Sequence, residues 1–270
     1  MTTLLTYRIS DVRQYINWVY FFHAWGLTGK PEDEKRKLRA ESELMMDGFE
    51  ERYRVSALFG LFDANSDADD IIIGGNIRLP FLRQQSAAAA GGPYMCLSDF
   101  IRPLASGQND KIGVFAVSVD AAMEHSHDDD VYMRLLAQTT ADRIAEAAAE
   151  KMHEEVRRRL WGYAPDEHLS MPELLRGDYM GIRPAVGYPS MPDISINFLL
   201  SEIIGMNRIG IRLTETGAMI PHSSVSGLMF AHPRSCYFDV GKIGEDQLRD
   251  YARRRGFTVG EMRRYLVANI

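Results

Sequence analysis

A run of nine residues, 181–189, combines side chains suited to a ligand with an anionic end and an aromatic end. Its sequence is GIRPAVGYP. Arg183 offers a planar fork of donors that fits a carboxylate or phosphate, and Tyr188 offers a flat ring with a polar tip. The two prolines stiffen the backbone, and Gly187 permits a close approach or a positive φ. We expect a rigid ligand-binding loop; the alternative is a structural turn with a salt-bridged arginine.

A long helix carries an acidic stripe. The stretch from about residue 130 to residue 161 is rich in Ala, Glu and Arg, which is typical of a helix. Asp142, Glu146 and Glu150 recur every four residues within it, so they share one face of the helix. Like charges at this spacing repel one another, so the pattern requires solvent screening or basic partners.

Most familiar catalytic signatures are missing from the sequence. There is no P-loop, no dinucleotide-binding glycine fingerprint after a strand and no HExxH zinc motif. The run SSVSG at 223–227 lacks the leading glycine of a nucleophile elbow. Residues 125–130, HSHDDD, are typical of a solvated loop. Cys96 and Cys236 form no CxxC pair, and we expect both to be buried as small apolar residues.

Several elements must position these residues. Runs rich in β-branched and aromatic residues predict strands over 57–62, 71–73, 112–119, 209–213, 225–231 and 237–240. Helices are expected over 32–53, 130–161, 192–204, 244–255 and 258–266, and a helix end followed by a turn over 86–93. Strand and helix runs do not alternate regularly, which favours an α+β fold with a largely antiparallel sheet.

Composition and charge limit the class of protein. Hydrophobic residues make up 46% of the chain and charged residues 25%, which is typical of globular domains. The net charge of −6 argues against non-specific nucleic-acid binding, which needs a basic surface. No apolar stretch approaches the roughly 18 residues that span a bilayer, and the N-terminus lacks a signal-peptide pattern. We expect residues 1–270 to form one cytoplasmic domain with no nucleic-acid or membrane partner.

The run GIRPAVGYP at 181–189 resembles a signature of the activation (reactivation) domain of vitamin B12-dependent methionine synthase. Other segments resemble the same family in the same order and cover nearly the whole chain. They include YINW at 15–18, LRQQ at 82–85, CLSDF at 96–100, ADRIAE at 141–146, WGYAP at 161–165, LTETGAM at 213–219, SVSG at 224–227 and DQLRDYARRRG at 246–256. The resemblance implies a C-shaped α+β domain, with a central twisted antiparallel sheet, that binds S-adenosylmethionine.

The resemblance also implies a role in restoring an oxidised cofactor. In the family, inactive cob(II)alamin is returned to methylcobalamin with an electron from a reduced flavodoxin-type protein and a methyl group from S-adenosylmethionine. The activation domain presents the methyl donor over the corrin and needs no general acid or base of its own. The chain lacks a cobalamin-ligand histidine motif, so we expect cobalamin to be carried by a partner methionine synthase chain.

Particular positions match the family's ligand residues. Arg183 is expected to bind the methionyl carboxylate, and Glu146 to pair with the ammonium or sulfonium charge. Asp142 matches an acidic position that contacts the cobalamin domain. The remaining matches are loop positions, a second ligand tyrosine and a position near the N-terminus. The full set for the cofactor is Arg183, Ala185, Gly187, Tyr188, Tyr237, Glu146 and Asn17.

Three positions depart from the family pattern. Asn17 stands where the family has aspartate, and losing that charge weakens a contact to a cationic amino group by about 1 kcal/mol or more. Ile194 stands at a histidine position and Ile220 at a tryptophan position. These departures motivate an alternative: a non-catalytic protein that senses S-adenosylmethionine or binds a partner. A third hypothesis is a free-standing methyltransferase with another acceptor.

Overall fold

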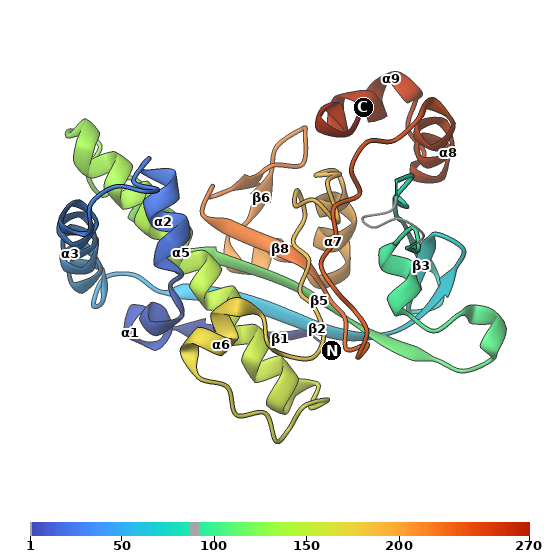
Figure 1. The fold of residues 1–270 in the computed structure, drawn as a ribbon, viewed down its shortest axis with the longest axis horizontal. Helices are drawn as coiled ribbons and strands as arrows, with labels where there is room; N and C mark the ends of the chain where they lie inside the picture. Colours follow the sequence, from blue (N-terminus) through green and yellow to red (C-terminus); the bar gives the residue numbers. More distant parts are fainter. Residues whose placement is uncertain (1, 87–91) are drawn as a thin grey trace.

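The computed structural model describes residues 2–86 and 92–270, and its centre is an antiparallel sheet (Figure 1). The strand order is β4-β3-β2-β5-β8, with β1 paired to β2 off this path. Its strands are β1 (Thr2–Tyr7), β2 (Val55–Asp67), β3 (Asp70–Ile73), β4 (Ile77–Pro80), β5 (Asp110–Val119) and β8 (Ser224–Met229). A separate pair joins β6 (Arg212–Leu213) to β7 (Met219–Ile220). The predicted α+β class with an antiparallel sheet is confirmed.

Helices surround this sheet. They are α1 (Ile9–Val12), α2 (Trp18–Ala24), α3 (Glu32–Phe49), α4 (Ala121–Glu124), α5 (Val131–Glu155), α6 (Met171–Arg176), α7 (Ile196–Ile204), α8 (Glu245–Arg255) and α9 (Val259–Tyr265). Figure 1 shows α2, α3 and α5 together at one end of the molecule and α8 and α9 at the other. No helix within residues 2–86 and 92–270 is long and apolar enough to cross a bilayer.

Strand β5 is the centre of the core because it is buried on both faces. Residues 112–119 are all buried, as expected for a strand that reads as a nearly continuous apolar run. Phe115 and Val117 pack into a cluster with residues of α3 and α5. Val114 and Ala116 pack on the opposite face, in a cluster with residues of α7. The alternation of side chains along the strand therefore sends successive residues into two separate cores.

Helix α5 carries the acidic stripe, and its local sequence explains its position. The Asp130 side chain caps its start by accepting the backbone N–H groups of Tyr132 and Met133, at 2.9 and 3.0 Å. Its inner face is rich in buried alanines, including Ala141, Ala145 and Ala148. These small side chains let the helix lie close to β5 and β8. The helix then continues into a π-helical turn at Val156–Leu160.

One predicted strand, 237–240, is wrong, and another, 209–213, is confirmed only at its end. Residues 209–213 hold the end of a 3₁₀ turn and only two strand residues, Arg212–Leu213. Residues 237–240 form no strand, because their backbone groups bond elsewhere. Val240 N–H donates to the Pro189 carbonyl at 3.0 Å, and the Gln84 side chain donates to the carbonyl of residue 239 at 2.7 Å.

The 86–93 segment and the two cysteines were also subjects of predictions. The expected helix end and turn at 86–93 falls mostly outside the described residues. Cys96 is buried as expected, whereas Cys236 is exposed, so the expectation for Cys236 is wrong.

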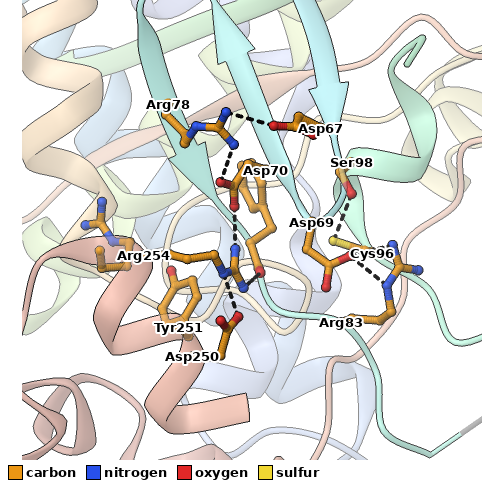
Figure 2. A network of polar contacts seen from close by, with 12 residues as sticks. Asp67, Asp69, Asp70, Arg78, Arg83, Cys96, Ser98, Asp250, Tyr251 and Arg254 are labelled. Atoms are coloured by element: carbon orange, nitrogen blue, oxygen red, sulfur yellow. Dashed lines mark hydrogen bonds and ion pairs between the residues drawn. The ribbon is translucent and has the colours of Figure 1, made fainter. Parts of the chain in front are cut away.

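A network of ion pairs fastens α8 to the sheet (Figure 2). Arg254 lies between the buried Asp70 of β3 and Asp250 of its own helix, and its Nε is 2.7 Å from Asp250 Oδ2. Arg78 of β4 bonds to Asp70 and to Asp67 of β2, each at 2.8 Å. The network therefore joins α8 to the three strands β2, β3 and β4.

The network predicts a pH dependence of stability. Hydrogen bonds from Arg253 and Arg254 hold the pKa of Asp250 below its usual range. A carboxyl with a lowered pKa in the folded state stabilises the protein above its unfolded pKa of about 4, and this is lost as the pH falls through the lowered value. Asp250→Asn is therefore expected to lower the melting temperature at pH 6, with a difference from the unmodified chain that shrinks below pH 4. A difference that stays constant from pH 6 to pH 3 contradicts this assignment.

Candidate functional site

Within the 181–189 loop, residues 182–186 lie along the edge strand β8 as an additional extended segment. Ile182 and Phe230 exchange two backbone hydrogen bonds, with N···O distances of 3.0 and 2.9 Å. The N–H groups of Leu228 and Val186 bond across the same seam at 3.1 and 2.9 Å. The loop is therefore held by the type of bonds that joins strands, and the predicted rigidity has a structural basis.

Glycine is required where the loop touches the strand. A Cβ on Gly227 of β8 would lie 2.2 Å from the Pro184 carbonyl oxygen and 2.9 Å from Ala185 Cα. Only a residue without a side chain allows the two backbones to approach so closely. Within the loop, Gly187 has φ +88°, as expected, and its N–H donates to the Met191 carbonyl at 2.8 Å. Both glycines therefore fix the path of the loop.

The Arg183 side chain points into the protein. It is only 9% exposed, and its Nη2 donates to Glu150 Oε2 at 3.1 Å. The guanidinium lies over the Phe115 ring, 5.5 Å from its centroid, and the backbone N–H of Arg183 donates to the Tyr237 hydroxyl at 2.9 Å. Burial on its own would lower the pKa of Arg183, but the negative charge of Glu150 raises it above its usual range. The side chain therefore stays cationic.

The ring of Tyr188 lies across from the acidic stripe. Its hydroxyl donates to Glu146 Oε1 at 2.6 Å, while half of the residue is exposed. Burial and the charge of Glu146 raise the pKa of Tyr188, so the phenol remains protonated and able to donate. The loop thus contributes both an inward cation and a partly exposed aromatic ring.

A cavity of about 250 Å³ lies between α5, the loop and β8. Its wall contains the carboxylates of Asp142 and Glu146, the Ala185 and Tyr188 positions of the loop, and the hydroxyls of three serines. The lining residues are Asp142, Arg143, Ala145, Glu146, Ala185, Val186, Tyr188, Met219, His222, Ser223, Ser224, Val225 and Ser226. Two carboxylates in a partly enclosed space favour a ligand group with positive charge.

Each residue of the acidic stripe has a partner on the segments that face α5. Asp142 accepts a hydrogen bond from the Ser223 hydroxyl at 2.7 Å, and His222 Nδ1 lies 3.4 Å from it. Glu146 accepts from the Tyr188 hydroxyl, and Glu150 pairs with Arg183, as described above. The repulsion within the stripe is thus offset by two hydroxyl contacts, one imidazole contact and one buried cation.

The structure does not bring every predicted residue to the cavity: Arg183 and Gly187 are not among its lining residues. Asn17 is absent from the cavity lining; its Oδ1 caps α2 by accepting the Val19 N–H at 3.1 Å. Tyr237 is half exposed and contacts the backbone of Arg183 instead. Of the departures from the family pattern, Ile194 lies beside Gly187, where a Cβ on the glycine would be 3.4 Å away. Ile220, in β7, is 44% exposed.

Two acidic residues near the cavity, Glu150 and Glu124, were not predicted as site residues from the sequence. Glu150 was visible only through its spacing in the stripe. Glu124 is buried and accepts the backbone N–H groups of His222 and Ser223, which fixes the turn that lines the cavity. Because these bonds join residues almost 100 positions apart, no local sequence pattern predicts them.

Fold and site together define a class of protein: an α+β domain with a cavity between a loop seated on β8 and the acidic face of α5. The family model described as vitamin B12-dependent methionine synthase, activation domain, matches residues 8–256. The chain therefore belongs to the family of methionine synthase activation domains.

A solved structure agrees with this identification. The crystal structure described as the MetH reactivation domain bound to AdoHcy matches with a TM-score of 0.91 and 38% sequence identity. The match covers 100% of this chain and 90% of that one. The family and the fold expected from the sequence are both confirmed.

Proposed function

We propose that the chain binds S-adenosylmethionine at the 181–189 loop and presents its methyl group to cobalamin carried by a partner methionine synthase chain. The observation that supports this most is the buried, cationic Arg183 on a loop seated against β8, within a family match that spans residues 8–256. The similar reactivation domain is described as bound to AdoHcy. AdoHcy is what remains of S-adenosylmethionine after it has given up its methyl group.

The overall step balances one electron and one methyl group. Cob(II)alamin gains one electron from a reduced flavodoxin-type donor and a methyl cation from S-adenosylmethionine, which yields methylcobalamin and AdoHcy. The chain's own residues supply binding and orientation. This fits a site whose wall offers hydrogen-bond donors and carboxylates.

The residues present fit the parts of S-adenosylmethionine. Arg183 binds the methionyl carboxylate with its guanidinium. The carboxylate of Glu146 attracts the positive sulfonium, and the exposed face of the Tyr188 ring is available to the adenine. Ala185 and Gly187 supply backbone contacts, and Tyr237 completes the loop side of the site. Asp142 is partly exposed at the cavity and is available to the cobalamin-bearing partner.

Reconstitution tests the proposal directly. The chain is mixed with a cobalamin-domain protein in the cob(II)alamin form, a reduced electron donor and S-adenosylmethionine, and methylcobalamin formation is followed by visible spectroscopy. We expect conversion that depends on the chain. Calorimetric heat on adding S-adenosylmethionine without any conversion supports instead a sensing or interaction protein, the second candidate, which the departures at Asn17, Ile194 and Ile220 favour. No heat at millimolar ligand rejects both.

The proposed role of Glu146 has its own prediction. Glu146→Gln keeps the shape of the side chain but removes its charge, so it is expected to weaken S-adenosylmethionine binding about tenfold and AdoHcy binding much less. The difference arises because only the first ligand carries a sulfonium. Calorimetric titration of both ligands measures it, with Tyr188→Phe as a control that removes the hydroxyl partner of Glu146 and keeps the carboxylate. Equal losses for the two ligands in Glu146→Gln count against the assignment.

A further inference from the structure

The buried pair of Arg183 and Glu150 is incompletely bonded. A single hydrogen bond joins them, from Nη2 to Oε2 at 3.1 Å. Within residues 2–86 and 92–270, neither Arg183 Nε nor Glu150 Oε1 has a hydrogen-bond partner, although both atoms are buried. Arginine and carboxylate groups commonly form two parallel bonds, and this pair forms one.

Buried polar atoms without a hydrogen-bond partner destabilise the folded protein. A buried donor or acceptor without a partner costs about 1–3 kcal/mol, and more when the group is charged. Nearly all buried polar atoms in native proteins therefore have partners. In each side chain here the free atom is separated from the bonded atom by a single carbon. The free donor and the free acceptor therefore lie at the two ends of one ion pair, one on a cation and the other on an anion.

We propose that Arg183 and Glu150 together bind the α-amino-acid end of the ligand, with Arg183 taking its carboxylate and Glu150 its ammonium group. This inference rests on the proposed function and adds Glu150 to the residues that contact the ligand. In an α-amino acid the carboxylate and the ammonium are attached to the same carbon. A zwitterion of this kind thus supplies an acceptor for Nε and a donor for Oε1 at neighbouring positions, which is what the pair lacks.

The charges around the pair favour Glu150 over other acceptors for the ammonium. Asn17 is neutral, and its oxygen already accepts the N–H of Val19. Glu146 accepts the hydroxyl of Tyr188, one helical turn away from Glu150. Glu150 is 14% exposed, so a small part of it remains reachable by a ligand. It is the acidic residue of the stripe that lies directly against Arg183.

Calorimetry with two ligands and two variants tests this inference. The ligands are AdoHcy and its N-acetyl derivative, which lacks the ammonium charge. In Glu150→Gln, the amide oxygen still accepts from Arg183 but the negative charge is gone. We expect this variant to bind AdoHcy at least tenfold more weakly and to bind the N-acetyl derivative as the unmodified chain does. Glu154→Gln is the matched control, because Glu154 lies one turn further along α5 and also pairs with an arginine, Arg158, at 3.1 Å.

The outcomes separate the inference from the proposed function. If the unmodified chain binds AdoHcy and Glu150→Gln binds it equally well or more tightly, Glu150 is only a structural partner or a competitor for Arg183, and the inference is overturned. If Glu150→Gln fails to fold, the unmodified chain still decides: equal affinity for AdoHcy and its N-acetyl derivative overturns the inference. If the unmodified chain binds no form of the ligand, the proposed function itself fails, and the inference falls with it.

Discussion

Replacing Arg183 with methionine is expected to abolish measurable binding of S-adenosylmethionine at millimolar concentrations. The same change is expected to lower the free energy of unfolding by about 3–5 kcal/mol, because it leaves Glu150 as a buried charge without its cation. Binding is measured by calorimetric titration and stability by denaturant unfolding. Retained affinity in a folded Arg183→Met variant contradicts the proposed carboxylate contact.

A double variant separates the two effects. Changing Arg183 and Glu150 together to methionine removes both charges, and apolar replacement of a buried ion pair is often neutral or stabilising. We therefore expect Arg183→Met/Glu150→Met to recover most of the lost stability and none of the binding. Recovery of both properties would show that the single variant failed only because it was destabilised.

Replacing Gly227 with alanine is expected to displace the binding loop from β8. The added Cβ would lie 2.2 Å from the Pro184 carbonyl oxygen and 2.9 Å from Phe115 Cε1, so backbone or core atoms must move. Overpacking of this kind costs about 1–3 kcal/mol. Because the displaced loop carries Arg183, we also expect S-adenosylmethionine affinity to fall at least tenfold, as measured by calorimetry.

Gly48 provides the matched control. It lies inside α3, and a Cβ there meets no atom within 4 Å. Gly48→Ala is expected to raise the free energy of unfolding by up to about 1 kcal/mol, because alanine favours the helix, and to leave ligand affinity unchanged. If Gly227→Ala behaves like Gly48→Ala, the close seating of the loop on β8 does not control the site.

The elements predicted best from the sequence are those with strong local signals. The alanine-rich stretch gave α5, and the apolar run at 112–119 gave most of β5. The false strand at 237–240 also has an apolar and aromatic sequence, but its backbone bonds to residues distant in the chain, Gln84 and Pro189. A local pattern shows which residues favour extended structure and does not reveal whether a neighbouring strand is present.

The sequence indicated the separate segments of the candidate site better than it indicated how they pack together. The composition of the 181–189 loop indicated a rigid, cationic and aromatic segment, and the four-residue spacing placed Glu150 on the face shared with Asp142 and Glu146. That Glu150 pairs with Arg183 depends on how β8 holds the loop against α5, which is a long-range arrangement. The resemblance to the family supplied the ligand that we propose, whereas the residue pattern indicated only a ligand with an anionic end and an aromatic end.

A crystal structure of the chain soaked with AdoHcy tests the central claim most directly. The account predicts ligand density beside the 181–189 loop, with the ligand carboxylate in hydrogen-bond contact with the Arg183 guanidinium. A bound ligand elsewhere, with Arg183 still paired to Glu150 alone, would contradict it.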